Sequence, residues 1–347
     1  MPNDTVTTAP AIVNSRLPDI ARLWPGLLLS TGIAVVAWQL GRWLPLIGGP
    51  VFGIVLGVIV RNTVTPPGAC LPGIRFAGKQ VLQWSIVALG LGLSLTQVAH
   101  TGLDSLSVTL VTVTAAFFTA WLLGRLLGIP SRLKLLIGVG TAICGGSAIA
   151  AVTPIIKADE HETAFAISTI FLFNLVAVLL FPLLGHLMHM SNQGFGLWAG
   201  TAINDTSSVV AAGYSYSSAA GDFATIVKLT RATLIIPVCL ALALIEAWRN
   251  KRSSGGDFQL GRVFPWFILW FVVASAVRTL GWIPTSWHAD LHVMAEFLII
   301  VALAAIGLSS DLRRMKSTGL RPIALGLGVW AAVAVSSLGV QWMMGQL

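Results

Sequence analysis

Long apolar stretches follow one another along almost the whole chain, and short polar connections separate them. A membrane-spanning helix needs about 20 apolar residues to cross about 30 Å of hydrocarbon. On this basis the pattern predicts eleven helical segments, near residues 24–40, 47–60, 80–98, 106–124, 133–156, 163–188, 195–213, 222–247, 263–281, 291–309 and 322–344. The predicted fold class is an all-α polytopic membrane protein, with residues 24–344 as one transmembrane domain after a polar tail, residues 1–23.

Composition excludes the other large classes of protein. Charged residues make up 10% of the 347 residues and apolar residues 56%, whereas an ordinary soluble domain has about 25% charged residues. A disordered chain would be far less apolar. The three cysteines cannot form a disulfide framework, and no metal or nucleotide motif is found. We therefore expect no cofactor, and a lipid bilayer and a small solute as partners, with self-association left open.

The net charge of +8 reflects topology rather than nucleic-acid binding, because Lys and Arg lie mainly in the connections. With a cytoplasmic N-terminus, sixteen of them fall in inner loops. Three, Arg42, Lys157 and Arg278, fall in outer loops. Cytoplasmic loops of membrane proteins are enriched in Lys and Arg. The distribution therefore predicts a cytoplasmic N-terminus, including residues 1–23 as a cytoplasmic tail, and a C-terminus on the other side.

Segment 195–213 is too polar to be recognised as a span from hydropathy. The basic loops at 125–134 and 249–262 must nevertheless lie on one side, so an even number of crossings has to separate them. We therefore expect this segment to cross as well, facing protein or water instead of lipid. A re-entrant loop elsewhere is the alternative.

A first intramembrane feature is the run Thr141–Ser147, with two adjacent glycines and a serine in the middle of segment 133–156. Gly145 and Gly146 favour a break in the helix, and Ser147 is able to cap the second half. A broken helix presents free N–H groups and a positive dipole end, both of which suit an anion. The alternative is a small-residue packing surface between helices.

A second feature is the run Asn204–Ser208 in the polar segment. It follows Gly200–Ile203, which repeats the Gly-Thr-Ala-Ile sequence of Gly140–Ile143. An isolated carboxylate in hydrocarbon is costly, so Asp205 should have a partner, a water-filled cavity or a proton. We expect Asp205, with Asn204, to couple transport to an ion or proton; a structural cap is the alternative.

A third feature lies within segment 222–247, where Lys228 and Arg231 share a helix face. At about 1.5 Å per residue, Arg231, Gly145 and Asp205 all lie near mid-depth. Buried cations, helix N-termini and hydroxyls together suit an oxyanion. The predicted anion-binding residues are Gly145, Gly146, Ser147, Thr206, Ser207, Lys228, Thr230 and Arg231. The alternative has Lys228 reaching outward and Arg231 paired with Asp205.

Two further stretches resemble each other, Ile86–Ser94 and Val301–Ser309. On the predicted topology these helices run in opposite directions, as an inverted repeat requires. Such repeats would span residues 47–189 and 195–344.

Four motifs together resemble the YeiH-type family of proposed sulfate exporters: CGGSAIAAVTPI (144–155), GTAINDTSSVVAAG (200–213), VKLTR followed by IIP (227–237) and IGLSSDL (306–312). The resemblance covers nearly the whole chain. It implies a layout similar to the bile-acid and arsenite transporters, with two inverted five-helix units, one added N-terminal helix and two broken, crossing helices. Segment 133–156 would be one crossing helix and segment 291–309 the other. Asn204 stands where the family pattern has a histidine, which puts any proton role of that histidine in doubt here.

These observations predict a non-enzymatic secondary transporter of the bacterial inner membrane that carries a small anion: sulfate, sulfite or an organosulfonate, in proton-coupled export. One alternative is a cation/proton antiporter in which Asp205 binds the cation. A more remote alternative is an intramembrane enzyme using Cys144 or Asp205.

Overall fold

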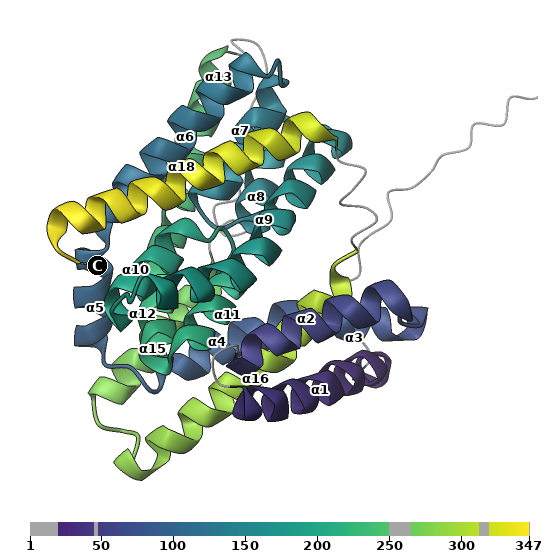
Figure 1. The fold of residues 1–347 in the computed structure, drawn as a ribbon, viewed down its shortest axis with the longest axis vertical. Coiled ribbons are helices and arrows are strands. Elements are labelled where there is room, and N and C mark those ends of the chain that lie inside the picture. The colour runs from purple at the N-terminus through teal and green to yellow at the C-terminus, as the bar shows by residue number, and fades with distance from the viewer. Residues whose placement is uncertain (1–19, 45–47, 250–264, 312–318, 347) are drawn as a thin grey trace, which may run out of the picture.

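The computed structural model describes residues 20–44, 48–249, 265–311 and 319–346. Residues 1–19 of the predicted tail 1–23 lie outside it, and residues 20–23 belong to the first helix. All the regular elements in those ranges are helices (Figure 1). The α-helices are α1 (Ile20–Trp43), α2 (Gly48–Thr63), α3 (Leu71–Phe76), α4 (Leu82–Gly90), α5 (Leu95–Asp104), α6 (Leu106–Leu126), α7 (Ser131–Ala142), α8 (Gly146–Ile156), α9 (Glu160–Leu187), α10 (Asn192–Ala202), α11 (Thr206–Tyr216), α12 (Ser218–Thr233), α13 (Ile235–Arg249), α15 (Trp266–Thr279), α16 (His288–Ser309) and α18 (Leu320–Met344).

Each predicted segment coincides with a helix or with a pair of consecutive helices. Within the described ranges, six helices are long and apolar enough to cross a membrane, or seven if a bent pair at 68–104 forms one span. Shorter apolar helices accompany them, including α2, α8 and α15. The all-helical, polytopic fold class is therefore confirmed.

Side-chain caps explain why several helices begin where they do. Asp159 accepts a hydrogen bond from the N–H of Glu162 at 2.7 Å, and the Glu162 carboxylate accepts one from the N–H of Asp159 at 3.1 Å. This reciprocal capping box starts α9. Ser191 and Ser217 cap α10 and α12 in the same manner, with single hydroxyl acceptors. Side-chain caps in short polar connections thus define the starts of these three helices.

One group of helices consists of α1, α2, α4 and α16, which pack on one another (Figure 1). Gly57 and Gly307 allow α2 and α16 to touch through their backbones, since a Cβ on Gly57 would lie 2.4 Å from the Ala304 oxygen. The α4 and α16 helices carry the two similar stretches found in the sequence. Gly78 lies beside Ile306 and Leu89 packs in one cluster with Ala295, so these stretches run in opposite directions, as predicted.

The helix α16 is continuous from His288 to Ser309. The expectation that segment 291–309 is the second broken helix is therefore wrong. The second break lies at 203–205, between α10 and α11, where Asn204 and Asp205 interrupt the helix. Polar residues that bond to nearby backbone favour such a break, whereas α16 is apolar along its length.

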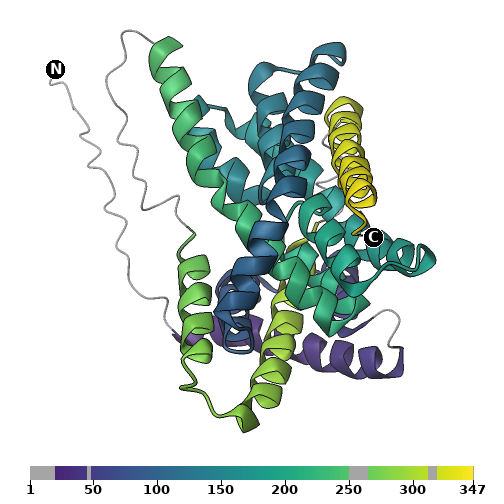
Figure 2. The same cartoon turned by 90° about the vertical axis from the view of Figure 1, so that its left-hand side faces the viewer.

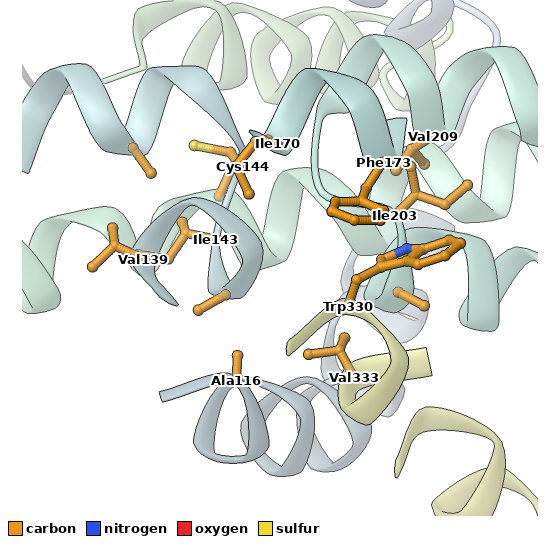
Figure 3. Close-up of a cluster of buried hydrophobic side chains, with 14 of the residues drawn as sticks. Ala116, Val139, Ile143, Cys144, Ile170, Phe173, Ile203, Val209, Trp330 and Val333 are labelled. Carbon is orange, nitrogen blue, oxygen red and sulfur yellow. The ribbon is translucent and has the colours of Figure 1, made fainter. Parts of the chain in front are cut away.

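The other helices, α6 to α13 and α18, surround a second and larger apolar core. Figure 2 shows the long helices of this group beside one another, and Figure 1 shows α18 running obliquely in front of them. Trp330 of α18 stacks on Phe173 of α9 with ring centroids 5.5 Å apart. Figure 3 shows both rings close to Ile203, with Ile143 and Cys144 of the first helix break in the same cluster. Both breaks are thus embedded in the core.

The α10–α11 segment is a hairpin that returns to the side from which it enters. The Ser217 hydroxyl, after α11, donates to Asn192 Oδ1 at the start of α10, at 2.8 Å. The Tyr216 hydroxyl donates to the backbone oxygen of Met190 at 2.5 Å. Since the two ends of the segment touch, it does not cross the bundle.

The α7–α8 segment is also a hairpin, from the opposite side. Gly138 of α7 packs against Ala120 of the preceding helix α6, and Thr153 of α8 lies 3.3 Å from Thr163 of the following helix α9. The start of α6 and the end of α9 line one cavity of about 400 Å³, through Ser105 and Ser191. The C-terminal end of α6, which precedes α7, and the N-terminal end of α9, which follows α8, therefore lie together. Moreover, α8 packs along α13, while α10 and α11 pack along α12.

The expectation that segment 195–213 crosses, and that segment 133–156 is a crossing helix, is corrected accordingly. The number of crossings between the basic loops is even if both segments are hairpins, and it is also even if both segments cross. The charge distribution therefore could not distinguish these two arrangements. The correction moves Lys157 from the predicted outer side to the side of the basic loop at 125–134. Of the three basic residues predicted outside, this leaves Arg42 and Arg278, which strengthens the charge bias.

Candidate functional site

The two hairpin tips meet in the interior of the protein. Gly145, at the first tip, has φ +69° and ψ −132°, a conformation that only glycine adopts readily. A Cβ on Gly145 would lie 3.1 Å from the Cβ of Asp205 at the second tip. The three sequence features predicted to share one depth therefore come together, because Lys228 and Arg231 also reach these tips.

Arg231 is fully buried and binds backbone oxygens at the ends of α7 and α10. Its Nε donates to the Ala142 oxygen at 2.5 Å, and one terminal nitrogen donates to the Thr141 oxygen at 2.7 Å. The other terminal nitrogen donates to the Thr201 oxygen. The planar guanidinium, with donors in a fixed fork, is suited to holding several carbonyls at once.

Lys228 is equally buried and lies one turn earlier on α12. Its ammonium donates to the Ile143 oxygen at 2.8 Å and to the Ile203 oxygen at 2.9 Å. Each tip thus gives one carbonyl to the same nitrogen. Lys228 therefore ties the two hairpins to each other and to α12.

The repeated Gly-Thr-Ala-Ile sequences explain why Lys228 and Arg231 bind equivalent carbonyl oxygens of both tips. Residues 140–143 and 200–203 are the last residues of α7 and α10 and the first of each break. The last carbonyls of a helix have no intrahelical partner and carry a partial negative charge. All five oxygens bound by Lys228 and Arg231 belong to these two repeats. The sequence repeat is therefore a pair of equivalent helix ends.

The two helices that follow the tips, α8 and α11, differ at their N-termini. The N-terminus of α11 is capped by Asp205, whose Oδ2 accepts the N–H of Ser207 at 3.0 Å and also its hydroxyl proton. At the N-terminus of α8 the N-cap residue, Gly145, has no side chain to act as a cap, and the Cys144 sulfur interacts with the N–H of Ala148. Gly146 is half-buried and Ser147 is exposed there. The positive end of α8 therefore opens beside the Asp205 carboxylate.

Several buried polar atoms around the tips lack a hydrogen-bond partner. Asn204, 1% exposed, has neither its Oδ1 nor its Nδ2 bonded. Asn174 of α9 accepts the Asp205 N–H at 3.3 Å, but its own Nδ2 is free. The Thr141 hydroxyl is also without a partner. Buried polar groups are normally satisfied, so these atoms indicate a place for a polar ligand or water.

Residues 25–326 match the family model described as conserved hypothetical protein 698. A UPF0324 membrane protein of Fusobacterium nucleatum is 40% identical over 345 residues, covering 92% of this chain and 98% of the relative. Relatives of the same description from Streptococcus pyogenes and Streptococcus pneumoniae are 44% and 42% identical, covering 93% and 92% of this chain and 98% and 97% of their own lengths.

The chain belongs to the UPF0324 membrane-protein family. This is the YeiH-type family, so the resemblance read from the motifs is confirmed. The relatives are described as membrane proteins, and integration in a membrane agrees with the apolar helices of this chain.

The UPF0324 fold brings together most, but not all, of the predicted site residues. Gly145, Gly146, Ser147, Thr206 and Ser207 lie at the two tips.

Thr230 does not reach the tips. Its hydroxyl donates to the Ile226 oxygen at 3.0 Å and lies beside Gly102 of α5. Asn174 was missed by sequence reasoning; a lone asparagine in the apolar segment 163–188 was the available signal.

The alternative interpretation of Lys228 and Arg231 is wrong. Lys228 does not reach outward, and Arg231 binds carbonyls; the ion pairs found among the described residues do not join it to Asp205. Both side chains donate their hydrogen bonds to backbone oxygens. Their charge still contributes to the potential at the tips, even where their donors are engaged.

Proposed function

We propose that this UPF0324 member is a secondary transporter of the bacterial inner membrane that binds a small anion at the hairpin tips. The observation that carries the proposal is the N-terminus of α8, where the N-cap residue Gly145 has no side chain and which opens beside half-buried Gly146 and exposed Ser147. Free N–H groups and the positive end of the helix dipole form an anion site. Discontinuous helices at mid-depth are a recurring means of binding substrate in secondary transporters.

Charge at the tips also favours an anion. Each helix end carries about half an elementary charge, negative at the ends of α7 and α10 and positive at the starts of α8 and α11. These four ends cancel. With Lys228, Arg231 and Asp205 charged, about one net positive charge is left. An anion lowers the electrostatic energy of such a site, whereas a metal cation raises it. This difference disfavours the cation antiporter.

Asp205 is the proposed coupling group. A bound anion would lie close to its carboxylate, so the two negative charges repel each other and anion binding favours uptake of a proton by the pair. Asn204, buried with free polar atoms, would complete the shell around the anion or its water. Sulfate, sulfite and organosulfonates are the proposed substrates, and proton-coupled export is the proposed direction.

Flux of labelled anions into proteoliposomes tests this proposal. We expect the purified protein to exchange at least one of ³⁵S-sulfate, ³⁵S-sulfite and labelled methanesulfonate, with flux that depends on an imposed pH gradient. Liposomes containing protein with Gly145→Val serve as the control, because the larger side chain would meet Asp205. Absence of flux for all three anions, combined with stabilisation of the protein by Na⁺ or K⁺, would instead favour the cation antiporter.

A further inference from the structure

A second group of ionisable side chains lies away from the tips, between the hairpin and the α1–α2–α4–α16 group. Its members are Tyr214 of α11, Asp222 of α12, and His292 and Glu296 of α16. The Tyr214 hydroxyl donates to Asp222 Oδ1. The other oxygen, Asp222 Oδ2, lies 3.7 Å from His292 Nε2. One carboxylate therefore joins the corner between α11 and α12 to α16.

The positions of these residues are defined by close packing. The Tyr214 ring lies directly on Gly221, where a Cβ would meet the ring at 2.5 Å, so the hydroxyl is aimed at the next residue, Asp222. The rings of Tyr214 and His292 are 6.0 Å apart and nearly perpendicular. Tyr214 itself is 6% exposed and packs in one apolar cluster with Val51, Ala295 and Ile299. The cluster of polar groups thus sits at the edge of an apolar interface.

Glu296 completes the group from the same face of α16, one turn after His292. It is partly buried and interacts electrostatically with both His292 and Asp222. Two carboxylates therefore face one histidine in a half-buried place. When His292 carries a proton, it lies between opposite charges; when it does not, the two carboxylates repel each other across the interface.

Among the described residues, the electrostatic interactions of Tyr214, His292 and Glu296 lie within this group. Arg61 of α2 is at the far end and pairs with Asp311 at 3.5 Å. The helix α4 has no charged residue, and Lys79 before it follows Gly78, which lies beside Ile306 at that same far end. Arg42 lies in the last turn of α1 and is exposed. Of the titratable groups on the other helices packed here, His186 of α9 contacts the ring of Tyr216, and His100 and Asp104 of α5 line the cavity of about 400 Å³. On α16 itself, His288 and Asp290 precede His292.

We propose that Asp222, His292 and Glu296, with the Tyr214 hydroxyl, bind one exchangeable proton that fastens α16 to the α11–α12 corner. The His292 side chain is 30% exposed and that of Asp222 19%, so water can deliver the proton. Protonation holds the hairpin against α16, and deprotonation loosens that contact. This proton site is separate from Asp205 and does not depend on the identity of the transported anion.

Thermal unfolding of the detergent-purified full chain between pH 5.5 and 8.5 tests the proposal, with the proton as the only probe. We expect the unfolding temperature of the wild type to fall as pH rises through the titration of a histidine, by roughly 2–4 °C. His292→Gln and Asp222→Asn should lose that pH-dependent fall. His161→Gln is the matched control, because His161 is exposed at the start of α9, and it should keep the wild-type profile.

Glu296→Gln gives an independent test if either variant fails to fold. It keeps the histidine and its main partner but removes the repelling carboxylate, so the fall at high pH should shrink. Transport is not measured in either test, so failure here and failure of the anion proposal are distinguishable. Profiles of His292→Gln, Asp222→Asn or Glu296→Gln that superimpose on that of the wild type would overturn the proposal.

Discussion

Lys228 and Arg231, three residues apart on α12, divide between them the terminal carbonyl oxygens of two hairpins that enter from opposite sides. Two fixed cations thus occupy the position where the negative ends of two helices face each other. The second helix of each hairpin begins beyond these carbonyls; Asp205 caps the start of α11, and the start of α8 is the end that we propose binds a ligand. This division of roles has consequences that can be measured.

Removing Lys228 should destabilise the fold. In Lys228→Met the Ile143 and Ile203 oxygens remain buried without a donor, and hydrogen bonds to charged groups contribute about 1.5–3 kcal/mol each. We expect a loss of roughly 3 kcal/mol or more, seen as a lower unfolding temperature in detergent. Lys157→Met is the matched control, because Lys157 is exposed. Equal unfolding temperatures for both variants would contradict the structural role of Lys228.

Arg231→Gln should likewise impair folding before it impairs binding. From the sequence alone, loss of anion binding in a folded protein is the expected outcome. Three bonds to the Thr141, Ala142 and Thr201 oxygens predict instead a variant of low stability. Arg231→Lys should rescue it only in part, since an ammonium lacks the planar fork. A fully stable Arg231→Gln protein that no longer binds sulfate would restore the original interpretation.

Gly145→Ala should strain the first tip. An alanine at φ +69° and ψ −132° costs about 1–3 kcal/mol, and its Cβ would meet Asp205. Gly32→Ala in α1 is the control, because nothing lies within 4 Å of a Cβ there; it should stabilise by up to about 1 kcal/mol. The difference in unfolding temperature between the two variants is the measurement. Similar values would argue against contact between the tips.

Asp205→Asn should keep the protein folded, because asparagine caps α11 as well as aspartate does. It removes one negative charge near the proposed anion. At an effective dielectric constant of about 20 and a separation of about 5 Å, this should tighten sulfate binding by roughly a hundredfold or more. Isothermal titration of sulfate into the wild type and the variant would show this; equal affinities would mean that Asp205 does not lie beside the anion.

Impermeant thiol labelling of intact cells distinguishes hairpins from crossings. In a protein without Cys144 and Cys239, Cys70 should resist labelling from outside if the N-terminus is cytoplasmic. With all three native cysteines replaced, Lys157→Cys should behave like Cys70, and Gln193→Cys should be labelled. Labelling of Lys157→Cys but not of Gln193→Cys would restore the crossing arrangement.

Hydropathy predicted the helical segments well, and the Gly145–Gly146 sequence correctly predicted the first break. The second break, at 203–205, was not predicted, because the second broken helix was expected at 291–309. The path of the hairpins was not predictable, because hydropathy is the same for a helix that crosses and one that turns back. The ligands of Lys228 and Arg231 are backbone oxygens, which carry no sequence signal of their own. The repeated Gly-Thr-Ala-Ile sequence was the available clue. Asp222 and His292 were missed, since only folding brings α12 and α16 together.

Substrate protection of a cysteine at the first tip tests the anion site most directly. Ser147→Cys, in a background without native cysteines, places an exposed thiol at the start of α8. We predict that saturating concentrations of the transported anion slow its labelling in proteoliposomes, and that the labelled protein no longer carries flux. A labelling rate that is independent of sulfate, sulfite and methanesulfonate, with undiminished flux after complete labelling, would contradict an anion site at the hairpin tips.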